Sequence, residues 1–164
     1  MKYFTRLIAL TASLVIASHV AAQTLTISNA WVRATVQGQK ATGAFMTVMS
    51  KENTKLIAAS SPVAGVVEIH EMKMDKDVMK MAALPNGLDL PAGKAVDLKP
   101  GGYHIMLMDL KQPLSKDVGV SLTLTFQDSS GKKSQQVVQV SVSLQPPMGP
   151  SSGMHHGGEH KHKD

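Results

Sequence analysis

Two histidines of this sequence are each followed, two positions later, by a methionine. They are His70 with Met72 and His104 with Met106. In a β-strand, residues i and i+2 point to the same face, so each pair would present an imidazole beside a thioether. Both segments therefore indicate a place where a nitrogen donor and a sulfur donor could meet one metal ion.

A third methionine-rich segment follows the first histidine across a short turn. Met79 and Met81 lie two and four residues after the turn residues Asp75-Lys76-Asp77. We expect a hairpin here, which would bring Met79 or Met81 next to the face that carries His70. The alternation of a strand does not decide between the two methionines.

The absence of cysteine decides which metal these donors suit. The 164 residues contain 11 methionines, 7 histidines and no cysteine, which excludes disulfide scaffolds, cysteine zinc sites, iron–sulfur clusters and thiol catalysis. Thioether sulfur is a soft, neutral donor that favours Cu(I) over zinc, calcium or magnesium, and imidazole also binds copper. Thioethers survive in an oxidising compartment, where thiols form disulfides. Two histidines with two methionines therefore predict a Cu(I) site.

Packing is the alternative to ligation, because methionine commonly fills hydrophobic cores. We expect Met46, Met49, Met74 and Met108 to be core residues of this kind. The two His-x-Met pairs differ from them, because they hold the only histidines of the expected folded region.

Short strands are expected to position these side chains. Apolar or alternating runs from Thr24 to Leu144 are separated by turn residues such as Pro85-Asn86-Gly87. The alternation over 121–126 has the period of a strand and not of a helix. The expected strands are 25–35, 44–50, 55–60, 66–74, 78–84, 103–110, 118–127 and 134–144. This spacing predicts an all-β fold, an antiparallel β-sandwich or barrel, and the six aromatic residues predict a mainly aliphatic core.

The composition changes after Leu144. Residues 145–153 are rich in proline, glycine and serine and cannot build a core, so we expect 145–164 to be a disordered tail. Four histidines lie within the last eleven residues, which is a metal-binding composition. The secondary metal ligands expected in the tail are Met148, Met154, His155, His156, His160 and His162.

Residues 1–22 have the pattern of a secretory signal peptide. Lys2 and Arg6 precede or border an apolar run over 7–17, and small residues end at Ala22, where we expect cleavage. A spanning helix needs about 20 apolar residues, so we expect no membrane span in the mature protein. No cysteine follows the run, which argues against a lipid anchor. We expect a soluble periplasmic protein whose folded domain covers 23–144.

Charge gives little indication of a macromolecular partner. Removal of the signal peptide takes Lys2 and Arg6 away and lowers the formal net charge from +5 to +3. The remaining charges are scattered, without a basic patch that contains aromatic residues, so we expect no nucleic-acid partner.

The order of His70, Met81, His104 and Met106 resembles the ligand pattern of the periplasmic copper chaperones called PCuAC. Ten residues separate His70 from Met81, as in that pattern, and twenty-two separate Met81 from His104, one more than in it. We expect the additional residue to lie in a loop over 85–100. Similar segments, within a resemblance that spans about 28–144, are 30–35 (AWVRAT), 70–72 (HEM), 88–93 (LDLPAG) and 100–108 (PGGYHIMLM).

The resemblance implies a cupredoxin-like β-sandwich that carries one exposed Cu(I) and is not an enzyme. It implies His70, Met81, His104 and Met106 as the ligands and Met72 as an auxiliary one. It also implies delivery of copper to a subunit of a respiratory haem–copper oxidase, directly or through another exported copper chaperone. The tail resembles a His- and Met-rich extension of some members, which adds a Cu(II) site.

Three other functions fit the same sequence. A copper resistance or storage protein would use the same ligands without serving an oxidase. A metal hydrolase would need hard ligands and an open water position, for which Glu68 and Glu71 lie near His70. A structural β-sandwich would bind no metal.

Overall fold

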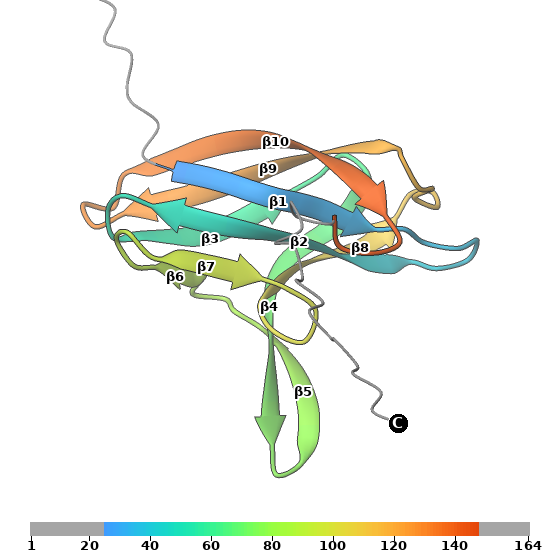
Figure 1. The fold of residues 1–164 in the computed structure, drawn as a ribbon, viewed down its shortest axis with the longest axis horizontal. Coiled ribbons are helices and arrows are strands. Elements are labelled where there is room, and N and C mark those ends of the chain that lie inside the picture. The colour runs from blue at the N-terminus through green and yellow to red at the C-terminus, as the bar shows by residue number, and fades with distance from the viewer. Residues whose placement is uncertain (1–24, 148–164) are drawn as a thin grey trace, which may run out of the picture.

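The computed structural model describes residues 25–147. Within this range the chain forms ten β-strands and no helix (Figure 1). The expected signal peptide and all the secondary ligands from Met148 onward lie outside the described residues, so these expectations stay predictions.

The strands follow one another with short connections. They are β1 (Leu25–Arg33), β2 (Ala41–Ser50), β3 (Thr54–Ser60), β4 (Ala64–Asp75), β5 (Val78–Ala83), β6 (Leu88–Leu90), β7 (Ala95–Leu98), β8 (His104–Leu110), β9 (Gly119–Asp128) and β10 (Lys133–Ser143). All eight strands expected from the sequence are present, with ends that differ by up to three residues. The all-β prediction is therefore confirmed.

The segment 85–100, expected to be a loop, contains the two strands that the sequence did not predict. β6 has three residues and β7 has four, which is too short for alternation to stand out. Their leucines nevertheless contribute to the core, since Leu88, Leu90 and Leu98 are all buried.

The strands form one continuous sheet that folds over on itself. The order is β5-β4-β8-β2-β1-β10-β9-β3-β6, and β7 pairs with the second half of β2. All neighbouring pairs are antiparallel except β1 with β10, which run parallel with Trp31 opposite Ser141. The purely antiparallel prediction is wrong for this pair. These strands come from opposite ends of the described chain, so no tight turn fixes their relative direction.

The inward faces of the sheet enclose one mainly aliphatic core. On β9, Val120, Leu122, Leu124 and Phe126 are at most 1% exposed and alternate with more accessible residues. Phe126 is the aromatic member of the buried cluster, whose other members are aliphatic residues and Met46. The expectation of an aliphatic core is confirmed.

The four methionines expected in the core divide into two groups. Met46 is buried in the core cluster, as expected. Met108 is half-buried on the outer face of β8 and is outside that cluster and the residues packed against it, so the prediction is wrong for Met108. The prediction is also wrong for Met49 and Met74, which are 40% and 65% exposed. Met49 lies on the outer face of β2, and Met74 lies near the end of β4, beyond the region where the two sheet layers enclose the core.

The hairpin of β4 and β5 projects from the body of the molecule (Figure 1). Asp75 pairs with Val78, so Lys76 and Asp77 form a two-residue turn. Both turn residues have positive φ, 47° and 65°, as the type I′ turns that match strand twist require. The turn fixes the register in which β5 returns along β4.

The core position of Phe126 yields a stability prediction. We expect Phe126→Ala to lower the free energy of unfolding by about 3–5 kcal/mol, because it removes a fully buried ring from a packed core. Val137→Ala, at a site that is 61% exposed, should change it by less than about 0.5 kcal/mol. Urea denaturation measures both. Equal effects of the two substitutions would contradict the assigned core.

Candidate metal centre

The register of β4 against β8 sets the two histidines of the described chain directly opposite each other. His70 pairs with His104, and their ring centroids are 5.7 Å apart with the rings at 65°. Ile69 and Ile105, the neighbours of the two histidines, also pair and are buried in the core. Side chains alternate along a strand, so both imidazoles lie on the outer face of the sheet.

Each imidazole has one nitrogen held by an oxygen acceptor. The Nδ1–H of His104 donates to the carbonyl oxygen of Gly102 at 3.0 Å, and the Nε2–H of His70 donates to the Glu68 carboxylate at 2.7 Å. A neutral imidazole carries one proton, so the second nitrogen keeps a lone pair. Nδ1 of His70 is buried and has no hydrogen-bond partner within the described residues. Such an atom costs about 1–3 kcal/mol unless something satisfies it.

The thioethers lie on the same face as the histidines. Met106 is two residues from His104 on β8, and Met72 is two residues from His70 on β4. On β5, Met81 lies opposite Met72, whereas Met79 lies opposite Met74. Met81 therefore lies nearer to His70 along the hairpin than Met79 does.

A hollow of about 250 Å³ opens among these side chains. His104, Met106 and Met72 line it together with Arg33 and Phe45. His70 and Met81 are not among its lining residues. His70 contacts the site through its ring against His104. The structure thus brings the two histidines, Met106 and Met72 together, with Met81 across from Met72.

Aromatic side chains that sequence reasoning did not single out border the site. Phe45 lies 6.3 Å from His104 and 4.7 Å from Trp31, measured between ring centroids. Gly43 pairs with Met106 across β2 and β8. A Cβ at Gly43 would lie 2.7 Å from the Phe45 ring, so the glycine leaves room for this ring. The guanidinium carbon of Arg33 is 5.6 Å from the Phe45 centroid. The sequence did contain a signal for this group, because in a strand over 31–33 the side chains of Trp31 and Arg33 point to the same face.

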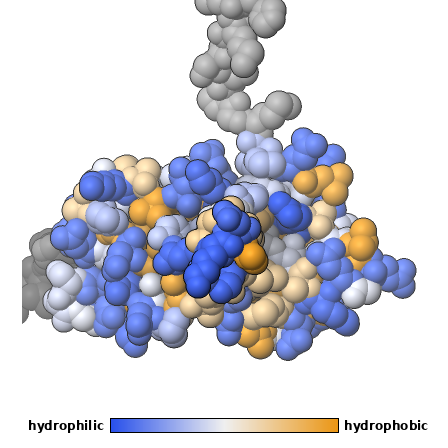
Figure 2. All heavy atoms as spheres, turned by 90° about the horizontal axis from the view of Figure 1, so that it is seen from below, coloured by the Kyte–Doolittle hydropathy of each residue, from blue (hydrophilic) through white to orange (hydrophobic). Residues whose placement is uncertain are grey.

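The opposite face of the hairpin is charged. Lys73 forms an ion pair with Glu71 at 2.7 Å, and Lys80 forms one with Asp75. The hydrogen bond and charge of Glu71 raise the pKa of the Lys73 ammonium. Viewed from the hairpin side (Figure 2), hydrophilic residues project at the centre with hydrophobic ones beside them. The hairpin is therefore amphipathic, with thioethers on one side and ion pairs on the other.

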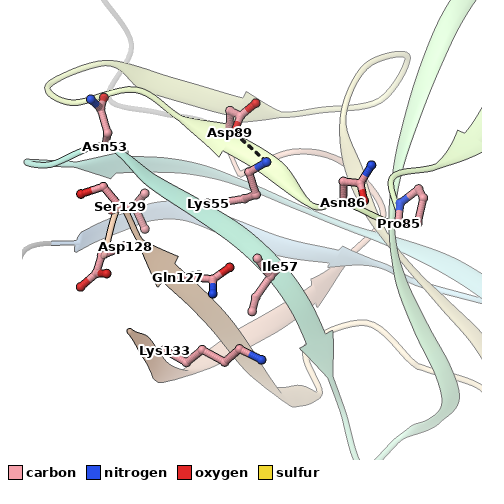
Figure 3. Close-up of a pocket in the computed structure, with 11 residues that line it drawn as sticks. Asn53, Lys55, Ile57, Pro85, Asn86, Asp89, Gln127, Asp128, Ser129 and Lys133 are labelled. Carbon is pink, nitrogen blue, oxygen red and sulfur yellow. Dashed lines mark ion pairs between the residues drawn. The ribbon is translucent and has the colours of Figure 1, made fainter. Parts of the chain in front are cut away.

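Hard-ligand sites are absent from residues 25–147. No group of three or more histidine, cysteine, aspartate or glutamate side chains in this range could hold a metal ion. A larger open hollow, of about 720 Å³, lies by β3, β6 and β9 (Figure 3). It is lined by Lys55, Asp89, Lys133 and other residues, of which none is a histidine or methionine.

The searched part of the chain, 25–147, contains no helix long and apolar enough to cross a membrane.

Fold and site together define an all-β domain that gathers imidazoles and thioethers on one outer sheet face. The chain belongs to the LpqE-like family, described as "Putative lipoprotein LpqE-like", whose family model matches residues 25–157. One relative is the "Putative lipoprotein Lxx21020" of Leifsonia xyli subsp. xyli, 35% identical over 104 residues, which are 63% of each chain. Another is the "Uncharacterized protein RP573" of Rickettsia prowazekii, 33% identical over 117 residues, 68% of this chain and 62% of that one. The match thus spans less than two thirds of either relative.

Solved structures share the cupredoxin-like fold. The apo PCuAC domain from PmoF1 has a TM-score of 0.59 at 22% identity and covers 74% of this chain and 95% of that one. The copper-bound PCuAC domain from PmoF2 has a TM-score of 0.56 at 21% identity, with 74% and 94% covered. Cu(I)-DR1885 from Deinococcus radiodurans has a TM-score of 0.52 at 28% identity, with 79% and 83% covered.

The hydrogen bonds of the two imidazoles predict opposite tautomers. In the metal-free protein with both imidazoles neutral, we expect the proton of His104 on Nδ1 and that of His70 on Nε2, because those atoms face oxygen acceptors. Two-bond proton–nitrogen NMR correlations distinguish the tautomers. Glu68→Ala should remove the preference at His70 and leave His104 unchanged. The same tautomer at both histidines would contradict the geometry.

Proposed function

We propose that this protein is an exported copper chaperone that holds one Cu(I) through His70, His104, Met81 and Met106. Met72, which lines the same hollow as His104 and Met106, serves as an auxiliary thioether. The observation that carries the proposal is the direct opposition of His70 and His104 on the outer face of β4 and β8.

The donor set favours Cu(I) over the metals of hydrolytic enzymes. Two neutral imidazole nitrogens and two neutral thioethers leave the charge of the ion unneutralised, which suits a soft monovalent ion better than Zn²⁺ or Mg²⁺. The hydrogen bonds from His70 to Glu68 and from His104 to Gly102 would orient the rings and leave a lone pair on each. Cu(I) at Nδ1 of His70 would also satisfy the buried atom that lacks a partner.

The comparisons support copper as the metal. Of the proteins that share this fold, the PmoF2 domain is copper-bound and DR1885 has a Cu(I) form. DR1885 is 28% identical to this chain, with 79% of this chain covered.

Release to a partner follows from the unequal exposure of the ligands. His70 and His104 are 8% and 5% exposed, whereas Met81 is 50% exposed. A donor of the acceptor protein can therefore enter as the Met81 sulfur leaves, while the buried imidazoles hold the ion until the exchange completes. We propose as acceptor a copper subunit of a respiratory oxidase or another exported copper chaperone.

Export and collection of copper complete the proposal. We propose that residues 1–22 direct the chain to the periplasm and are removed after Ala22. The histidines near the C-terminus would bind Cu(II) and raise the copper concentration near the folded site. A reductant from the compartment would then reduce this Cu(II) to Cu(I) by one electron, before the ion enters the folded site.

Anaerobic titration with Cu(I) against a chromophoric chelator tests the site. Wild type should take up one tightly bound equivalent, and His104→Ala should lose it, because a buried donor nitrogen is removed. The matched control replaces His155, His156, His160 and His162 with alanine, which should leave the tight Cu(I) equivalent intact.

Two results would contradict this assignment. Equal Cu(I) affinity of wild type and His104→Ala would exclude His104 as a ligand. If the variant without the four C-terminal histidines loses tight Cu(I) binding while His104→Ala keeps it, the site lies at the C-terminal histidines.

A further inference from the structure

Four methionines share one face of the hairpin formed by β4 and β5, and the proposed copper site uses only the inner two. Met72 lies opposite Met81, and Met74 lies opposite Met79. In an antiparallel pair, opposite side chains share a face with their Cβ atoms about 4.5–5.5 Å apart. The hairpin therefore carries two successive pairs of thioethers, of which the outer pair has no assigned role.

Packing does not explain the outer pair. Met74 and Met79 are 65% and 45% exposed, on a hairpin that projects from the body (Figure 1). Neither belongs to the core cluster or to the residues packed against it. Two large apolar side chains in solvent gain little hydrophobic stabilisation, so burial in the core does not account for this pair.

The outer pair continues directly into the proposed inner site. A strand rises about 3.3–3.4 Å per residue, so positions two residues apart are separated by about 7 Å. Met74 and Met72 are separated by one such step, and His70 follows Met72 after another. The unbranched methionine side chain has three rotatable bonds and can reach across part of this distance.

Charge on the hairpin does not oppose a monovalent cation. Lys73 is paired with Glu71, and Lys80 with Asp75, on the face away from the methionines. In the turn, Lys76 is followed by Asp77. The three lysines of residues 71–83 are thus equalled in number by three carboxylates, so this segment carries no net positive charge.

We propose that Met74 and Met79 form a second, outer Cu(I) site, from which the ion passes to the inner site by thioether exchange. This inference rests on the proposed function of the inner site. In each exchange a bond from Cu(I) to one sulfur forms as a bond to another breaks, without electron or proton transfer. Two thioethers without an imidazole hold Cu(I) more weakly than the inner set, so the net movement is inward.

NMR of the full chain with carbon-13-labelled methionine methyl groups tests the outer site under anaerobic Cu(I) titration. The first equivalent should shift the methyl resonances of Met81 and Met106, and further Cu(I) should shift those of Met74 and Met79. Met49 is the matched control, because it is 40% exposed on β2 and lies outside the hairpin.

Variants separate the two sites. In His104→Ala the inner response should be lost, while Met74 and Met79 still shift. In Met74→Leu with Met79→Leu, which conserves volume, the inner response should remain while Cu(I) uptake from the chelator slows.

The outcomes distinguish this inference from the function on which it rests. If Met81 and Met106 respond while Met74 and Met79 shift no more than Met49, the outer site is overturned and the inner site stands. If Met74 and Met79 respond while Met81 and Met106 stay unchanged, copper binds at the tip, but the inner site and inward transfer are both contradicted.

Discussion

The pairing of β4 with β8 is the interaction on which the candidate site depends. It aligns Ile69 with Ile105 in the core and His70 with His104 on the outer face. A slip of one residue would turn the isoleucines to solvent and the imidazoles into the core. Burial of these two apolar side chains, at about 1.5–3 kcal/mol each, therefore stabilises the register that sets the two histidines opposite each other.

The same alternation separates stability from chemistry across the sheet. The inner face packs aliphatic residues around Phe126, and the outer face carries the donors and the aromatic group of Trp31 and Phe45. The hairpin of β4 and β5 projects beyond the core (Figure 1), so its methionines are not needed to fill the core. This division allows soft donors to stay accessible while the imidazoles are nearly buried.

The local sequence pattern predicted most of the strands and the two His-x-Met pairs of the candidate site. Alternation predicted eight strands and placed each histidine on the same face as the methionine two residues later. It could not give the opposition of His70 and His104, which depends on long-range strand pairing. The hydrogen bond from His70 to Glu68 likewise appears only in three dimensions. Met74 was expected in the core because its segment is strand-like, and sequence alone does not show that this end of β4 leaves the body.

X-ray absorption at the copper edge, on the full chain loaded anaerobically with one equivalent of Cu(I), tests whether imidazoles and thioethers bind one ion together. We predict a coordination shell that contains two imidazole nitrogens and two thioether sulfurs, with the sulfur contribution reduced in Met106→Leu. A shell of nitrogen or oxygen alone, or a sulfur contribution unaffected by that substitution, would contradict it.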